Sequence, residues 1–191
     1  MALGGVQMVT VFAFAINNFK RSEEEVDALM ALAKARLLEL YQHGEVISRY
    51  SVRVRVVGKK ELLPADVQEA IMTLEKATCH NTGAVLNICM PYSSQDEMCQ
   101  AYASCVDVDQ LGECTPPITR KDLDDKLLVS PNVPVDLLIR TSKVHRLSDF
   151  LLWQCNEHTQ LHFVDQYWPM FGAKELIPIL LQYQRCKIMG Y

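Results

Sequence analysis

The chain has 191 residues, with 19 basic and 23 acidic side chains and a formal net charge of −4 at pH 7. Hydrophobic residues make up 49% and charged residues 22%, which excludes a disordered or fibrous protein. The acidic balance argues against non-specific binding to nucleic acid. No apolar run approaches the ~18 residues needed to cross a bilayer, and the N-terminus lacks the charged region of a signal peptide. We therefore expect a soluble, intracellular protein with one domain, residues 1–191.

The predicted elements alternate between strands and helices along the chain. Strand-like runs occupy residues 8–14, 52–57, 85–90, 135–140 and 160–164, and helix-like runs occupy residues 22–43, 64–80, 95–106, 120–128 and 173–183. Residues 107–117 are rich in turn formers and predict a loop. This alternation indicates an α/β fold: an open, mostly parallel sheet with helices on both faces.

The helix predicted from Ser22 to His43 has clear start and stop signals. Ser22 and Glu25 form a capping-box pattern, and Gly44 follows the last residue of helical periodicity. At about 1.5 Å per residue, this helix is roughly 33 Å long, which is long for a domain of this size.

Metal-binding patterns are weak. The seven cysteines include no C-x-x-C pair, and free thiols are the default for a reducing compartment. His158 and His162 are four residues apart, as two ligands on a helix would be, but His162 lies in a segment that is more typical of a strand. No metal ligands are identified.

Ligands of parallel α/β sheets bind beyond the carboxyl ends of the strands, so the residues that follow each strand matter most. After the first strand, Asn17, Asn18 and Arg21 lead into the capped helix. They suit an anion such as phosphate, although a simple polar turn is the preferred interpretation. After the third strand, Asp96 and Glu97 form either a helix-dipole pairing, which is preferred, or a catalytic acid pair.

The segment after the fourth strand carries the strongest functional signal. Arg140 ends an apolar strand, and Lys143, Arg146 and three hydroxyl groups follow within a few residues. A guanidinium group can donate two hydrogen bonds to two diphosphate oxygens at once, and serine hydroxyls such as that of Ser148 can donate to the remaining oxygens. This diphosphate interpretation is preferred over a solvated basic loop.

At these residues the sequence resembles the cis-prenyltransferases, which include undecaprenyl and dehydrodolichyl diphosphate synthases, and the eukaryotic branch is the more similar. The resemblance rests on residues 9–21, 22–30, 54–64, 86–97, 136–154, 163–169 and 180–184. The family joins isopentenyl diphosphate to an allylic, farnesyl-type diphosphate with the help of Mg²⁺, and the product enters an apolar tunnel. It works as homodimers or as heterodimers with a homologous subunit. Its lipid product implies a peripheral position on the cytoplasmic side of the endoplasmic reticulum or on lipid droplets.

The resemblance implies roles for particular residues. Isopentenyl diphosphate would be bound by Arg140, Arg146 and Ser148. Asn18 and Arg21 would lie beside the reacting groups. The tunnel wall would include Leu29, Ala33 and Leu37.

The sequence also departs from the family pattern. The strand that bears the family's catalytic Asp and the Gly-Asn-Arg-Arg-Trp loop after it have no counterpart here, so we expect the first strand and helix to be missing from a truncated domain. Asn17, Lys59 and Val144 stand where acids are usual, and Lys143 stands where Gly is usual. Three functions stay open: an elongating prenyltransferase, a catalytically degenerate subunit of an active one, and an altered condensation on the same scaffold.

Overall fold

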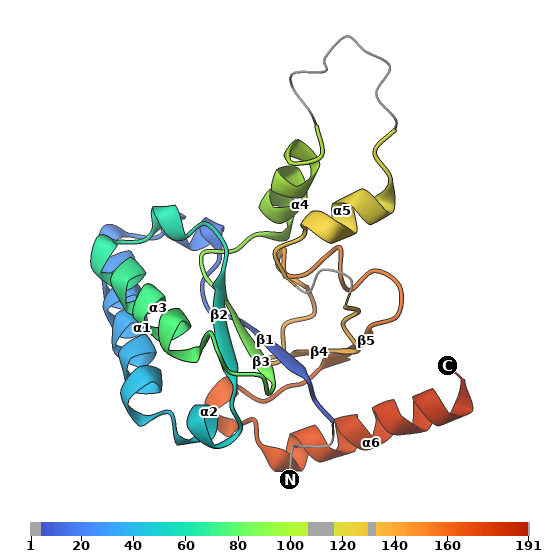
Figure 1. The fold of residues 1–191 in the computed structure, drawn as a ribbon. Helices are drawn as coiled ribbons and strands as arrows, with labels where there is room; N and C mark the ends of the chain where they lie inside the picture. The colour runs from blue at the N-terminus through green and yellow to red at the C-terminus, as the bar shows by residue number, and fades with distance from the viewer. Residues whose placement is uncertain (1–4, 107–116, 130–132, 191) are drawn as a thin grey trace. The chain divides into compact units, whose positions relative to one another are not determined.

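A computed structural model describes residues 5–106, 117–129 and 133–190. The chain forms two compact units, Met1–Gln100 and Ala101–Tyr191 (Figure 1). The expectation of a single domain over residues 1–191 stays a prediction. None of the helices in the described ranges combines the length and the apolarity that a bilayer span requires.

The first unit is built on a three-stranded parallel sheet. Its elements are β1 (Met8–Phe12), η1 (Ile16–Lys20), α1 (Glu23–His43), α2 (Glu45–Arg49), β2 (Arg53–Val57), η2 (Lys60–Leu62), α3 (Ala65–Thr78), β3 (Val85–Cys89) and most of α4 (Ser94–Ala103). The strand order is β1-β3-β2, and Leu86 of β3 lies between Val9 of β1 and Val54 of β2. Helices α1 and α3 run side by side over one face of this sheet (Figure 1).

Helix α1 begins and ends where the sequence predicts. The Ser22 hydroxyl accepts a hydrogen bond from the Glu25 backbone N–H at 3.4 Å. The other half of the predicted capping box is not formed within the described residues, since no bond from the Glu25 carboxylate returns to Ser22. Gly44 is the C-cap, and a Cβ there would lie 2.3 Å from the carbonyl oxygen of Leu40, so only glycine fits.

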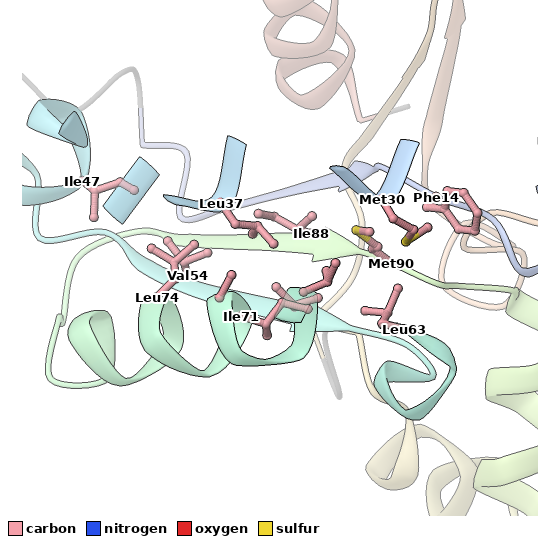
Figure 2. Close-up of a cluster of buried hydrophobic side chains, with 13 residues drawn as sticks. Phe14, Met30, Leu37, Ile47, Val54, Leu63, Ile71, Leu74, Ile88 and Met90 are labelled. Carbon is pink, nitrogen blue, oxygen red and sulfur yellow. The ribbon is translucent and has the colours of Figure 1, made fainter. Parts of the chain in front are cut away.

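The core of the first unit lies between the sheet and the two helices (Figure 2). Leu37 of α1, Leu74 of α3 and Ile88 of β3 are all buried there. Burying side chains of this size stabilises a fold by roughly 1.5–3 kcal/mol each. This cluster fixes α1 and α3 against the strands whose carboxyl ends carry the candidate site.

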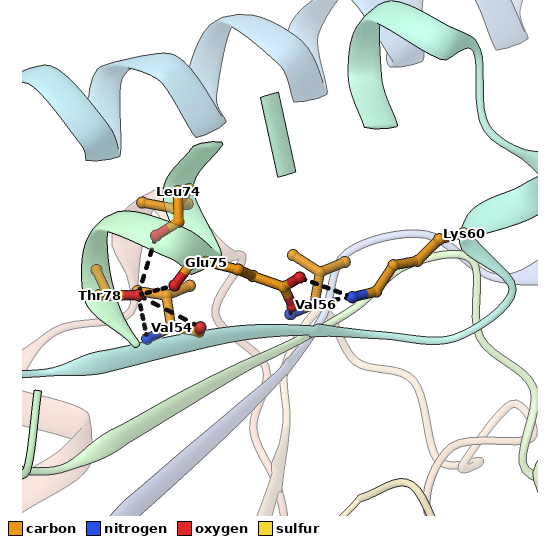
Figure 3. A network of polar contacts seen from close by, with 6 residues as sticks. All are labelled: Val54, Val56, Lys60, Leu74, Glu75 and Thr78. Carbon is orange, nitrogen blue, oxygen red and sulfur yellow. Dashed lines mark hydrogen bonds and ion pairs between the residues drawn. The ribbon is translucent and has the colours of Figure 1, made fainter. Parts of the chain in front are cut away.

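Side chains of α3 close the outer edge of β2 (Figure 3). The Val54 N–H donates to the Thr78 hydroxyl at 3.1 Å, and this hydroxyl also donates to the Leu74 carbonyl at 3.0 Å. An edge strand with unpaired N–H groups is a template for aggregation. Here the helix supplies the partners that a further strand would otherwise provide.

The second unit contains a separate two-stranded parallel sheet. Its elements are α5 (Arg120–Lys126), β4 (Leu137–Arg140), β5 (Gln160–Phe163), η4 (Trp168–Met170) and α6 (Ala173–Met189). Leu138 of β4 pairs with Leu161 of β5. The predicted α/β class and parallel pairing are therefore confirmed, with the strands in two hydrogen-bonded sheets.

Some boundaries differ from prediction. β1 stops at Phe12 because the N–H groups of Ala13 and Phe14 both donate to the Cys89 carbonyl, at 3.0 and 3.2 Å, which ends the regular alternation. Helix α6 continues to Met189 and ends at Gly190, whose φ of +79° favours glycine. α2 was not predicted. Most of the predicted 107–117 loop lies outside the described residues.

Candidate functional site

Three segments meet at the carboxyl ends of β1, β2 and β3. Gly58 follows β2 with a φ of +134°, and the Lys59 N–H donates to the Pro91 carbonyl after β3 at 2.9 Å. A Cβ on Gly58 would lie 1.9 Å from that same carbonyl oxygen. Glycine is therefore required for the two strand ends to approach this closely.

The segment after β1 places Asn18 and Arg21 at this edge. Asn18 Oδ1 accepts from the Ala15 N–H at 2.8 Å, and the Arg21 N–H donates to the Asn18 carbonyl at 3.1 Å. The rings of Phe14 and Phe19 pack edge to face with centroids 4.9 Å apart, which holds the turn against the core. Arg21 is exposed directly before α1, whose N-terminus attracts anions.

Lys59 and Asp96 form an ion pair between the end of β2 and the start of α4. The hydrogen bond from Asp96 is the main cause that raises the pKa of Lys59 above its ordinary value. Lys59, which stands where the resemblance implies an acid, therefore has an acidic partner close by. Of the two neighbouring carboxylates, Asp96 and Glu97, the first is engaged in this ion pair.

Asp96 and Glu97 have different partners and different degrees of burial. Glu97 is 2% exposed, and its Oε2 accepts a hydrogen bond from the Tyr92 hydroxyl at 2.5 Å, whereas Asp96 pairs with Lys59. Burial, followed by the nearby charge of Glu97, raises the pKa of Tyr92, so its phenol stays a donor. Burial likewise raises the pKa of the Cys89 thiol, which is an inert core group.

In the second unit, the segment after β4 adopts an unusual backbone. Ser142, Lys143 and Ser148 have φ values of +70°, +56° and +52°, a region that residues with side chains rarely occupy. The Ser142 N–H donates to the Gln166 carbonyl at 2.8 Å, which ties this turn to the chain after β5. Strained backbone of this kind concentrates at ligand sites.

Arg140 and Arg146 leave their positive charge available. Arg140 is half-buried at the end of β4, and Arg146 and Ser148 are exposed. Neither guanidinium forms an ion pair within the described ranges of the chain. An unpaired guanidinium beside hydroxyl groups is a binding group for phosphate oxygens.

The predicted site residues thus fall into two groups, one in each unit. Leu29, Ala33 and Leu37 share one face of α1. Leu37 is part of the core cluster, and the other two are half-buried against it. The sequence reasoning missed Tyr92 as a site residue. Its position three residues after β3, shortly before the acids of α4, was the available signal.

The described residues do not by themselves fit a Mg²⁺ ion. Magnesium prefers carboxylate oxygens, and no three His, Cys, Asp or Glu side chains converge within the ranges that the structure covers. We therefore assign no reaction step to the ion.

Comparisons with known proteins agree with this architecture. Residues 1–189 match the family model for undecaprenyl diphosphate synthase. A dehydrodolichyl diphosphate synthase complex subunit of Schizosaccharomyces pombe is 45% identical over 94% of this chain and 69% of its own length. The human subunit of that complex is 40% identical over 94% of this chain and 54% of its own length. The chain therefore spans between about half and two thirds of the lengths of these relatives.

Solved structures show the same likeness. A probable undecaprenyl diphosphate synthase of Campylobacter jejuni superposes with a TM-score of 0.79 at 27% identity, over 93% of this chain and 80% of that one. Lavandulyl diphosphate synthase of Lavandula x intermedia, solved with dimethylallyl diphosphate, superposes with a TM-score of 0.82 at 27% identity. The match covers 94% of this chain and 76% of that one. With the family model matched over nearly all of its residues, the chain belongs to the undecaprenyl diphosphate synthase family of cis-prenyltransferases.

Proposed function

We propose that this chain elongates a prenyl chain in the cis configuration, by joining isopentenyl diphosphate to an allylic, farnesyl-type diphosphate. The allylic C–O bond breaks and diphosphate leaves, a C–C bond forms to the isopentenyl unit, and one proton is lost from that unit. The observation that carries the proposal is the loop after β4: Arg140 and Arg146 form no ion pair with any other described residue, and Ser148 follows in the same loop.

The chemistry of this loop fits a diphosphate. Guanidinium groups offer paired N–H donors that match two phosphate oxygens at once, and they stay charged at any physiological pH. The hydroxyl groups of Ser142 and Ser148 add donors without adding charge. The left-handed backbone at both serines supports a loop shaped by ligand binding, because strain of this kind is kept where function requires it.

The residues of the first unit have complementary roles in this proposal. Asn18 and Arg21 offer an amide and a guanidinium beside the N-terminus of α1, which suits the diphosphate that leaves. Leu29 and Ala33 offer an apolar face of α1 to the growing chain, and Leu37, which is packed in the core, supports that face from below. Each buried CH₂ of a hydrocarbon gains about 0.8 kcal/mol in such surroundings.

The main test is isopentenyl diphosphate binding measured by calorimetry. Arg146→Ala should weaken binding roughly tenfold to a hundredfold, the range expected when charge-assisted hydrogen bonds are lost. Arg185→Ala removes the same charge from an exposed position on α6 and should leave binding unchanged. Equal affinities for the Arg146→Ala protein and the unmodified protein would contradict the proposal.

A second candidate is a non-catalytic subunit that stimulates an active homologue. The Lys59–Asp96 ion pair supports it, since a base stands where the resemblance implies an acid. Relatives named as complex subunits also support a partner. Turnover of farnesyl and isopentenyl diphosphates by the purified chain favours the enzyme. Turnover that requires an added homologous synthase favours the subunit.

We also propose that α6 contacts a homologous subunit, as part of a homodimer or a heterodimer. Ile177, Leu181 and Ile188 are 54%, 60% and 86% exposed, and their spacing places them along one side of the helix. Exposed apolar side chains in such numbers mark interaction surfaces. By sedimentation analysis, Leu181→Glu should weaken self-association or capture of the homologue, whereas Gln182→Glu, with the same added charge, should not. A peripheral position on the endoplasmic reticulum or lipid droplets remains the location that the lipid product implies.

A further inference from the structure

Glu97 is buried to an extent that a helix-dipole role does not explain. It lies in the first turn of α4 and is only 2% exposed. A favourable interaction with a helix N-terminus is available to an exposed acid and needs no burial. Burying a carboxyl group is unfavourable unless hydrogen bonds compensate. The Glu97 carboxylate accepts a hydrogen bond from the hydroxyl of Tyr92 at 2.5 Å, and Tyr92 is itself 1% exposed.

Tyr92 connects this buried acid to the segment after β1. The Tyr92 N–H donates to the Phe14 carbonyl at 3.0 Å, and the Ile16 N–H donates to the Tyr92 carbonyl at 3.1 Å. These two bonds bracket Ala15, which forms an isolated parallel bridge with Tyr92. The Tyr92 ring also packs edge to face on Phe12, with centroids 6.0 Å apart. The position of Tyr92 therefore sets the position of residues 14–16.

Ala15 in turn holds the residues proposed to lie beside the reacting groups. Its N–H donates to Asn18 Oδ1 at 2.8 Å, and its carbonyl accepts from the Asn18 N–H at 2.9 Å. The Arg21 N–H continues the series by donating to the Asn18 carbonyl. Because its Oδ1 already accepts this bond, Asn18 presents its two Nδ2–H donors to a ligand. Donors are what phosphate oxygens require.

We infer that Glu97 is a positioning residue: through Tyr92, it holds the turn that aims Asn18 and Arg21 at the allylic diphosphate. This inference rests on the proposed function. The competing explanation is a core hydrogen bond that contributes to stability alone. The two differ in where a mutation acts, since a positioning residue affects one turn and one substrate, and a merely structural residue affects the whole unit.

The experiment combines hydrogen exchange with kinetics. In the full-length protein, or in its complex if a partner is needed for turnover, Glu97→Ala and Tyr92→Phe should speed amide exchange in residues 13–21 by about tenfold, as local opening predicts. The KM for the allylic diphosphate should rise, or kcat fall, by about tenfold, with the KM for isopentenyl diphosphate unchanged. Glu97→Gln keeps an acceptor oxygen. Its exchange rates in residues 13–21 and its kinetic constants should stay within about twofold of those of the unmodified protein.

Thr78→Val is the matched control, since it removes a buried hydroxyl from the same unit at the edge of β2. It should lower the melting temperature and leave the kinetics unchanged. Unchanged exchange in residues 13–21 of the Tyr92→Phe and Glu97→Ala proteins would overturn the inference, and so would faster exchange with unaltered use of the allylic substrate. If the unmodified protein and its complex turn over neither substrate, the proposed function fails. Exchange in residues 13–21 then decides by itself whether Glu97 holds the turn.

Discussion

The carboxylate of Glu75 accepts a hydrogen bond from the backbone N–H of Val56 at 2.7 Å, so a helix side chain occupies the place of a strand neighbour at the edge of β2. The Lys60 ammonium donates to both oxygens of the same carboxylate at 2.9 Å (Figure 3). The lysine holds the carboxylate in place, and the carboxylate protects the edge.

Replacing Glu75 by Leu should destabilise the protein by about 1–3 kcal/mol, because the Val56 N–H loses its partner in a partly buried place. Urea unfolding measures this change. Glu69→Leu, at an exposed position of the same helix, is the control and should change the stability by no more than about 0.5 kcal/mol. Equal midpoints for the two variants would show that the edge contact contributes nothing.

Lys143 has a φ of +56°, and the family resemblance places glycine at this position. Lys143→Gly should relieve the left-handed strain and stabilise the protein by about 0.5–1 kcal/mol, after the extra freedom of glycine in the unfolded chain is subtracted. Lys121→Gly, in the exposed face of α5, should instead destabilise by about 1 kcal/mol. Thermal melting compares the two, and a loss of stability in both would refute the strain argument.

Ala33 lies on the α1 face assigned to the tunnel wall, where it is half-buried against the core cluster. If this face meets the growing product, Ala33→Leu should narrow the space and shift the products toward shorter chains. Ala35→Leu, on an exposed part of the helix, makes the same change in size and should leave the products as they were. Chromatography of labelled products distinguishes the two, and identical product lengths would count against the tunnel assignment.

Asp122 caps the N-terminus of α5 with Thr119. Its Oδ2 accepts from the Thr119 N–H at 2.8 Å and from the Thr119 hydroxyl at 2.7 Å. Both bonds lower the pKa of Asp122 below its ordinary value of 3.8, and the bond from the Thr119 hydroxyl has the larger effect. Because the folded pKa is the lower one, the stabilisation is complete well above pH 3.8 and is lost as the pH falls through the folded pKa.

We therefore expect α5 to fray first at its N-terminus below about pH 4, which amide exchange at Leu123 would report. Asp122→Asn cannot titrate, so its exchange should be free of that pH dependence. A Leu123 amide that exchanges identically in the two proteins at every pH would remove the carboxylate from this role.

Much of the fold follows from local patterns. The Ser22 cap, the Gly44 stop and the apolar runs of β2 and β3 were predicted within one or two residues, because caps and periodicity act over a few neighbouring positions. The boundary of β1 was wrong by two residues. The Cys89 carbonyl that accepts from both Ala13 and Phe14 lies more than seventy residues away along the chain.

The candidate site divides in the same way. Arg140, Arg146 and Ser148 lie within one short segment, so residue types and spacing alone are enough to predict a diphosphate site there. The preferred helix-dipole interpretation of Asp96 and Glu97 did not anticipate that one would pair with Lys59 and the other would be buried against Tyr92.

The sequence by itself determined the α/β class, the parallel pairing and the residue types that suit a diphosphate. Only the tertiary structure decided which neighbour each acid has and how the turn that carries Asn18 is held. The physical reason is that helix and strand signals are properties of nearby residues. Burial and hydrogen-bond partners depend instead on which distant strand ends the sheet brings together.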